Sequence, residues 1–253
     1  LDFDSPPQVR AGLNVVYTAL LATVYYAMKT VVDPTILPNA GLARAITVNA
    51  REGTILRCIH PAAVDGRITA CQRVVDLIHG AFAKVIPERV IAACNGSVHV
   101  ASFNGTRPNG ALWVYLETIG GGFGARHNKD GLDGVHVHMT NTSNLPVEAL
   151  ENEYPITLRR YELVDGSGGD GEFIGGMGLR RQIRSEGHVC RTFIHGSRRL
   201  SSPWGLFGGG GEAARAVHGV DLQAVLHVPP GGGLVEPVAV GEGAADFVDH
   251  VVL

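Results

Sequence analysis

The amino-acid sequence predicts an α+β fold, in which two largely buried helices pack on a predominantly antiparallel β-sheet with glycine-rich turns. Two apolar stretches of helical length lie early in the chain, and short runs that alternate apolar and polar residues occupy most of the rest. Glycine supplies 34 of the 253 residues and clusters between these runs, which is typical of tight turns and close backbone approaches. The length allows one large or two small domains.

The first predicted helix covers residues 15–32, with Asn14 placed to cap it and Pro34 placed to end it. Its length would also suit a membrane-spanning helix, but its threonines, tyrosines and Lys29 favour a helix buried in a large core. Residues 43–56 alternate around a turn, which predicts a pair of strands or a strand with an extended return.

A second helix is predicted from Thr69, where Thr69 and Gln72 form a Thr-x-x-Gln capping box, up to the break at Pro87. A short third helix is expected over residues 146–154, before Pro155. The remaining alternating runs predict strands over residues 97–103, 111–119, 134–140, 156–164, 179–186, 190–196 and 225–229. A sub-boundary near residues 155–165 would separate an α+β part from a mostly β part.

Composition indicates an ordinary globular protein. Hydrophobic residues make up 45% of the chain and charged residues 18%, and the net charge is −3, which argues against a nucleic-acid-binding protein. The four cysteines are scattered without zinc-finger spacing or a recognisable active-site context, so we expect reduced thiols in a cytoplasmic protein, and no thiol nucleophile. The N-terminus lacks the features of a signal peptide.

The stretch from Glu117 to Arg126, ETIGGGFGAR, contains the pattern G-x-G-x-x-A of a dinucleotide-binding loop. The residues that follow do not predict the helix which that loop requires, and no G-x-x-x-x-G-K-[ST] motif occurs, so the sequence offers no local site for ATP. Glu117 follows an aromatic-rich strand and precedes a glycine turn, which makes it a candidate for acid–base catalysis. The alternative is that it hydrogen-bonds its own loop.

His136 and His138 would point to one face of a strand, at a spacing that suits two metal ligands. Two hydrogen-bonded histidines at a strand end are the alternative. Downstream, a group of hydroxyl and amide side chains could orient an amide or carboxylate substrate, or could simply cap helices and stabilise turns. This group consists of Thr140, Asn141, Thr142 and Asn144.

Several long motifs resemble one family. They are YLETIGGGFGARHNKDGLDGVHVHMTNTSNLPVEALENEYP, RRYELVDGSGGDGEFIGGMGLRRQIR, DPTILPNAGLARAITVNAREGTIL and PWGLFGGGGE. Together they make the chain similar to the hydantoinase B/oxoprolinase family, which includes the B-type part of N-methylhydantoinase and of 5-oxoprolinase and, more distantly, of acetone and acetophenone carboxylases. The resemblance runs along nearly the whole chain and places residues 1–253 in the C-terminal portion of a B-type subunit.

The resemblance implies hydrolysis of a cyclic amide driven by ATP. An A-type partner with an actin-like fold would use the ATP, and a metal-bearing N-terminal B-type part would complete the site. The cofactors implied for this hetero-oligomer are thus ATP and a divalent metal ion, and neither has a recognisable binding motif in this chain. We expect the chain to be inactive alone and to bind neither nucleic acid nor membrane.

On this basis we expect the chain to contribute one wall of a substrate site. Glu117 would assist proton transfer or orient water, and His136 and His138 would sit beside a metal held elsewhere. The residues expected to bind substrate are Thr140, Asn141, Thr142, Asn144, Gly121 and Gly122. Two alternatives stay open: a non-catalytic assembly module of such a complex, or a subunit of an ATP-dependent ketone carboxylase.

Overall fold

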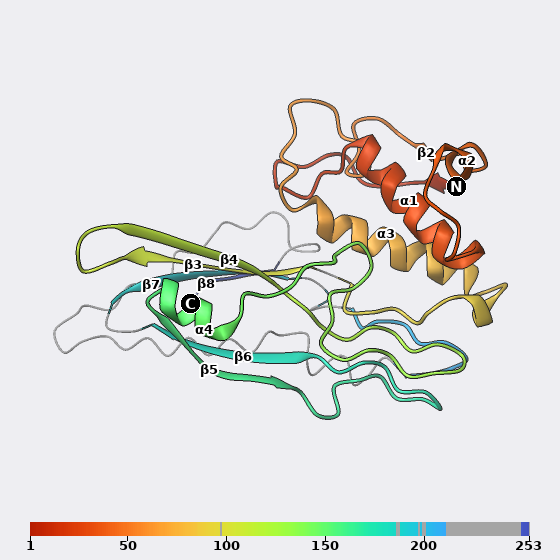
Figure 1. Ribbon diagram of the computed structural model, residues 1–253. Coiled ribbons are helices and arrows are strands. Elements are labelled where there is room, and N and C mark those ends of the chain that lie inside the picture. The colour runs from red at the N-terminus through yellow and green to blue at the C-terminus, as the bar shows by residue number, and fades with distance from the viewer. Residues whose placement is uncertain (97, 186–187, 197, 199–200, 211–248, 253) are drawn as a thin grey trace.

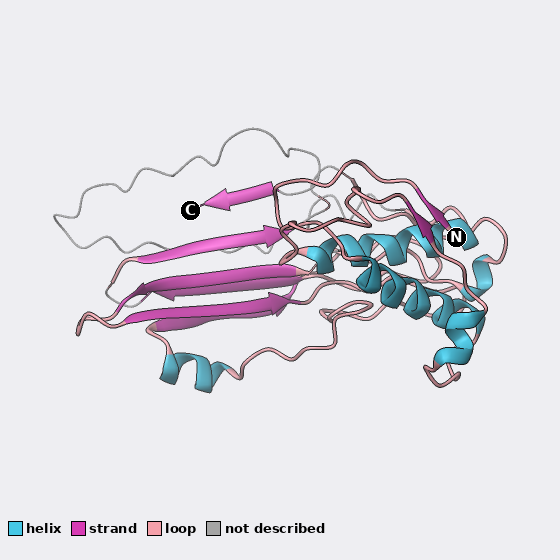
Figure 2. Cartoon of the chain, turned by 90° about the horizontal axis from the view of Figure 1, so that it is seen from above, coloured by secondary structure: helices cyan, strands magenta, loops and turns pink. Residues whose placement is uncertain are grey.

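The computed structural model describes residues 1–96, 98–185, 188–196, 198, 201–210 and 249–252. The predicted α+β class is confirmed, because antiparallel strands form one end of the molecule and a group of helices forms the other (Figure 1). The view from above shows the same division, with the N-terminus among the helices (Figure 2). Each end has its own hydrophobic core.

The first core lies between α1 (Tyr17–Val32) and α3 (Arg67–Phe82), which pack against each other. The fully buried apolar residues of α1 recur every three or four positions, as a helix needs to build one apolar stripe. They are Leu20, Val24, Ala27 and Val31. The first three belong to one core cluster with Val74, Val75 and Ile78 of α3. A short helix, α2 (Ala40–Arg44), follows α1.

The helix starts differ from those predicted. The capping residue of α1 is Val16, and the buried Asn14 instead binds the backbone of Val9, Ala11 and Ala63, so it fastens the N-terminal loop. The capping box in α3 was also wrong. This helix begins at Arg67 after Gly66, so Gln72 lies inside the helix and its amide reaches another part of the chain.

Of the two alternatives predicted over residues 43–56, a pair of strands or a strand with an extended return, the pair of strands is absent. Only β2 (Asn49–Ala50) forms there, and it pairs in parallel with β1 (Asp2–Phe3) at the N-terminus. The residues that follow form a turn closed by a bridge between Thr54 and Arg57. The alternating pattern therefore does correspond to a strand, but this strand pairs with the N-terminal residues and not with its own neighbours in sequence.

The main sheet has the order β4-β3-β7-β8, and every neighbouring pair in it is antiparallel. Its strands are β3 (His99–Thr106), β4 (Leu112–Ile119), β7 (Cys190–Gly196) and β8 (Asp249–Val252). A second antiparallel pair joins β5 (Ile156–Leu163) to β6 (Leu179–Ser185). The last predicted strand, residues 225–229, lies outside the described residues.

The second core lies between the main sheet, the β5–β6 pair and the short helix α4 (Val147–Glu153). Along β4 the side chains alternate, so Trp113, Tyr115 and Glu117 face inward while their neighbours face solvent. Residues from both sides of positions 155–165 share this core. A 3-10 turn, η1 (Pro87–Arg89), links the helices to the strands.

The strand predicted over residues 134–140 is absent. Val135 makes only an isolated bridge with Gly121, and His138 has a φ of 46°, in the left-handed region that breaks an extended strand. The expected strand geometry, with His136 and His138 on one face, is therefore wrong. Among the described residues, no helix combines the length and the apolar character needed to cross a membrane.

The α1–α3 core gives a first testable prediction. Leu20→Ala should lower the free energy of unfolding by about 2–5 kcal/mol, because Leu20 is 0% exposed and its loss leaves a cavity. The control is Leu77→Ala on α3, where the side chain is 63% exposed and the expected change is within about 0.5 kcal/mol. Chemical denaturation of both variants measures this, and equal losses would contradict the assignment of the core.

Candidate functional site

A buried polar cluster lies where α3 meets three loops. Asp76 projects from α3, and its carboxylate forms an ion pair with Arg198 through Oδ2. The other oxygen, Oδ1, is 3.0 Å from Nε2 of His138, and the same nitrogen is 2.9 Å from Sγ of Cys94. Asp76, Cys94, His138 and Arg198 are all buried, so residues far apart in sequence meet in the interior.

The cluster changes the ionisation of its members. Burial alone would raise the pKa of Asp76, but the hydrogen bond and charge of His138, together with Arg198, outweigh it and lower that pKa. Burial and the Asp76 charge raise the pKa of the Cys94 thiol well above its usual range. Burial and the charge of His138 lower the pKa of His79 to about 4. His79 is therefore neutral near pH 7.

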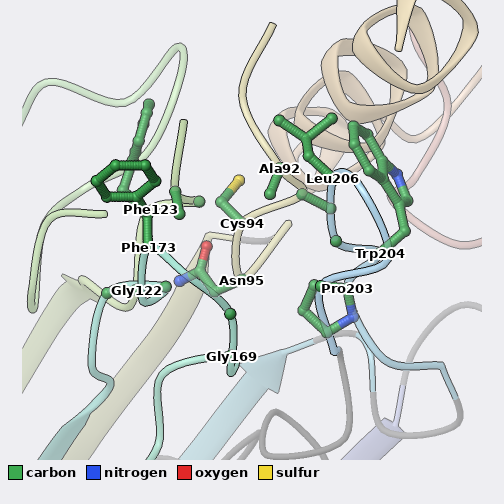
Figure 3. A pocket seen from close by; sticks show the side chains of 18 of the residues that line it. Ala92, Cys94, Asn95, Gly122, Phe123, Gly169, Phe173, Pro203, Trp204 and Leu206 are labelled. Carbon is green, nitrogen blue, oxygen red and sulfur yellow. The ribbon is translucent and has the colours of Figure 1, made fainter. Parts of the chain in front are cut away.

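A cavity of about 590 Å³ adjoins this cluster (Figure 3). Its walls come from residues 92–95, 120–127, 167–179 and 203–210, and Cys94 belongs to the first of these segments. Figure 3 shows Cys94 and Asn95 between the aromatic rings on one side and Trp204 on the other. Glycine backbone forms much of the remaining surface.

The glycine clusters exist because these segments lie backbone against backbone. A Cβ atom at Gly122 would overlap the carbonyl oxygen of Gly176, and one at Gly124 would overlap that of Ala92. Backbone hydrogen bonds hold the segments at this separation, for example from Gly176 N to the carbonyl oxygen of Phe123 at 2.9 Å. The cavity therefore has a wall of fixed peptide groups.

Asn95 is the polar side chain that the glycine loop accommodates most closely. A Cβ at Gly121 would overlap the amide nitrogen of Asn95, so this contact requires glycine at position 121. The Oδ1 atom of Asn95 is buried and has no hydrogen-bond partner in the described part of the chain. An unpaired buried acceptor costs free energy, which a bound donor would recover.

Glu117 lies at the end of β4, on the inner face, and is 6% exposed. Its Oε2 forms an ion pair with Arg181, which is fully buried on β6, and its Oε1 accepts a hydrogen bond of 2.6 Å from Nδ2 of Asn144. The guanidinium of Arg181 stacks over the ring of Tyr161, 4.6 Å from its centroid. Each carboxylate oxygen of Glu117 therefore already has a donor.

The structure brings some of the predicted site residues together and separates others. Gly121 and Gly122 line the cavity, whereas Asn144 belongs to the Glu117 cluster. The hydroxyl of Thr140 donates to the carbonyl oxygen of Val137 and accepts a hydrogen bond from Gln72. It therefore joins the loop to α3.

The other predicted residues are more accessible. Asn141 and Thr142 are exposed, and the hydroxyl of Thr142 is 3.0 Å from that of Thr118. His136 is half-buried, and its burial lowers its pKa. The recognition roles assigned to these residues stay predictions.

The sequence reasoning did not single out Asp76, Cys94 or Asn95. A signal for Asp76 was present, because Gln72, Asp76 and His79 recur at helical spacing and give α3 a polar stripe on a buried face. Cys94 and Asn95 lie in a loop with no periodic pattern, so their approach to α3 and to the glycine segments could not be read from sequence.

A family model, hydantoinase B/oxoprolinase, matches residues 1–242. The chain belongs to this family. It is 43% identical over 203 residues to an uncharacterized protein of Methanocaldococcus jannaschii, and the match covers 80% of this chain and 35% of that protein. It is also 34% identical over 170 residues to the B-type polypeptide of a putative D-/L-hydantoinase from a Pseudomonas species, covering 66% of this chain and 28% of that protein.

A solved structure has the same fold. It is an ATP-dependent caprolactamase from Pseudomonas jessenii, similar with a TM-score of 0.65 and 25% sequence identity, over 78% of this chain and 35% of that one. The hydantoinase B/oxoprolinase chain described here thus spans about a third of the length of these relatives. The match to the family model includes every segment that lines the cavity and both buried clusters.

The Glu117 ion pair gives a second prediction. Glu117→Gln should lower the free energy of unfolding by about 3–5 kcal/mol, because it leaves the buried Arg181 without its anionic partner. Glu162→Gln is the matched control, since Glu162 forms ion pairs with Arg160 and Arg180 at a partly exposed position and should lose less than about 1 kcal/mol. Urea unfolding compares the two, and similar losses would argue against a buried pair.

The glycine wall gives a third prediction. Gly122→Ala should destabilise the protein by about 1–3 kcal/mol, because the added methyl group meets the Gly176 carbonyl and forces the two segments apart. Gly210→Ala should be tolerated, because the nearest atom to a Cβ there is 3.9 Å away. Thermal unfolding of both variants measures the difference, and a harmless Gly122→Ala would refute the close packing.

Proposed function

We propose that this chain is part of an ATP-dependent cyclic-amide hydrolase of the hydantoinase or 5-oxoprolinase type, and that it contributes one wall of the substrate site. Membership of the hydantoinase B/oxoprolinase family supports this reaction class. The observation that carries the proposal is the cavity of about 590 Å³, whose volume is within the range of small-molecule sites.

The lining of the cavity suits a small, flat, polar ring. The side-chain amide of Asn95 contains both a donor and an acceptor, which is the complement of a ring amide with adjacent N–H and C=O groups. Its Oδ1 is buried without a protein partner in the described residues, and a ring N–H would become its partner once the amide turned toward the cavity. Phe123, Phe173 and Trp204 offer apolar faces on which such a ring could rest.

The residues predicted from sequence fit this proposal in different ways. Gly121 and Gly122 shape the cavity, and Gly121 leaves room for Asn95. Glu117 and residues 135–148 do not line the cavity. In our proposal they form a neighbouring wall that another polypeptide completes. Because both oxygens of Glu117 already accept hydrogen bonds, it would act on a proton or a water only after Arg181 or Asn144 moved.

The proposal assigns ATP use to another polypeptide. The chain has no phosphate-binding loop motif, and it spans about a third of the length of its relatives. We therefore propose a cytoplasmic hetero-oligomer, in which an A-type subunit uses ATP and an N-terminal B-type part carries the divalent metal. The chain would be inactive alone.

One observation favours a second role for part of the molecule. Glu117 and Arg181 form a buried ion pair, and the partly buried Asn144 binds the second oxygen of the carboxylate, while Tyr161 covers the guanidinium from a more exposed position. Such a cluster suits a module that only shapes the fold and its interfaces. The two roles differ in what they predict for Asn95, which has no part in that cluster.

The test measures ATP hydrolysis and ring opening by the assembled complex with 5-oxoproline and with hydantoin. Asn95→Ala should lower kcat/KM about 10- to 100-fold, because the ring amide of the bound substrate would lose its hydrogen-bond partner in the protein. Asn109→Ala is the matched control, since Asn109 lies in an exposed turn and should leave kcat/KM unchanged.

Two outcomes would overturn the proposal. Full activity of Asn95→Ala would support an assembly module instead, because the cavity would then have no part in turnover. ATP-dependent carboxylation of acetone without hydrolysis of either ring would support a ketone carboxylase. The chain without its partners should turn over neither substrate.

A further inference from the structure

Three chemically different ligand atoms converge beside the cavity. They are Oδ1 of Asp76, Sγ of Cys94 and Nε2 of His138, and all lie within 4.8 Å of one another. The separations are 2.9 Å between sulfur and nitrogen, 3.0 Å between nitrogen and oxygen, and 3.5 Å between sulfur and oxygen. The three residues are buried, so the three ligand atoms face one another without bulk solvent between them.

The tautomer of His138 decides which atoms face one another. A proton on Nε2 would bind Asp76. A proton on Nδ1 would instead set the lone pair of Nε2 against the Asp76 carboxylate, and a cation bound between the two atoms would replace this repulsion with attraction. Nδ1 is buried without a partner among the described residues in either case, so it does not distinguish a metal from hydrogen bonds.

We propose that Asp76, Cys94 and His138 bind a transition-metal ion of the Zn²⁺ class. One cation placed between them would accept a lone pair from each of the three atoms that face one another. A tetrahedral zinc site with ordinary bond lengths separates its ligand atoms by roughly 3.4–3.6 Å. The 3.5 Å between sulfur and oxygen is within this range, whereas the 2.9 and 3.0 Å to Nε2 are shorter, so the His138 ring would have to move back by about half an ångström to admit the ion.

The donor set selects the kind of metal. Magnesium and calcium prefer oxygen ligands, whereas a thiolate, an imidazole and a carboxylate together suit zinc or cobalt. Three protein ligands also leave a fourth coordination position. Cys94 lines the cavity, so the metal would lie at the cavity wall.

The surrounding charges allow a cation here. Arg198 binds Oδ2 of Asp76, which leaves Oδ1 free for a metal and fixes the orientation of the carboxylate. The ring of the neighbouring His79 meets that of His138 edge-on. The thiolate and carboxylate together offset the charges of Arg198 and one positive charge of the metal.

The metal would join α3, the segment around Cys94 and the loop around His138. Of the three ligands only Cys94 lines the cavity, so the ion would fasten this part of the cavity wall to α3 and to the loop around His138. The inference does not depend on the proposed reaction. It also concerns a site within this chain, separate from the metal expected in an N-terminal B-type part.

The test loads chelator-stripped protein with Co²⁺ and follows the thiolate-to-cobalt charge-transfer band, with Zn²⁺ competing for the site. We expect one equivalent of Co²⁺, displaced by Zn²⁺. Loss of a direct ligand should cost at least as much as the ~10–100-fold typical of a supporting residue. Cys94→Ser should therefore abolish the band, and His138→Gln should lower the affinity for Co²⁺ at least ~100-fold.

Cys71→Ser is the matched control, because Cys71 is also buried but lies in the core between α1 and α3. It should keep the band and the stoichiometry. Failure of the wild-type protein to retain either metal after dialysis, or a band that persists in Cys94→Ser, would overturn the proposal.

If Cys94→Ser does not fold, X-ray absorption of the Zn²⁺-loaded wild-type protein shows whether sulfur coordinates the metal. One sulfur with nitrogen and oxygen ligands supports the site. A first coordination sphere without sulfur overturns it.

Discussion

The buried carboxylate of Asp76 is the constraint on which the centre of this molecule depends. A charge in the interior is tolerated only when it is paired and hydrogen-bonded, and Asp76 meets this condition by contacting Arg198, His138 and Cys94. Since these partners come from three separate loops, the electrostatic requirement of one helical residue fixes where the loops lie. The helical end and the strand end of the molecule are joined through this cluster.

Close contact between backbones is the second constraint. Where the glycine-rich segments meet, peptide groups rather than side chains form the interface, and a Cβ at several of these positions would overlap a carbonyl oxygen. Such packing is rigid, because the segments are fastened by backbone hydrogen bonds and cannot adjust by side-chain rotation. A cavity made this way presents its polar groups in fixed directions, which suits recognition of a small polar ring.

The two buried charge clusters differ in their position relative to the cavity. Glu117 and Arg181 neutralise each other inside the core between the sheets, and this pair joins β4 to β6. Asp76 and its partners instead lie beside the cavity, and one of them, Cys94, lines it. The candidate chemistry of this family member is therefore concentrated around residues 92–95 and their contacts with α3. The carboxylate of Glu117 is held through both of its oxygens, by Arg181 and by Asn144.

The sequence by itself determined the α+β class, the positions of α1, α3 and α4, most of the strands and the family, because periodicity and long motifs are local signals. It did not determine that residues 134–140 form a loop, since the left-handed backbone at His138 depends on packing against α3. It singled out Gly121 and Gly122, which line the cavity, but gave no reason to join Asp76 to Cys94. Only the tertiary structure decided that, because the meeting of two loops on a helix is set by buried charge and backbone packing, which act between residues distant in sequence.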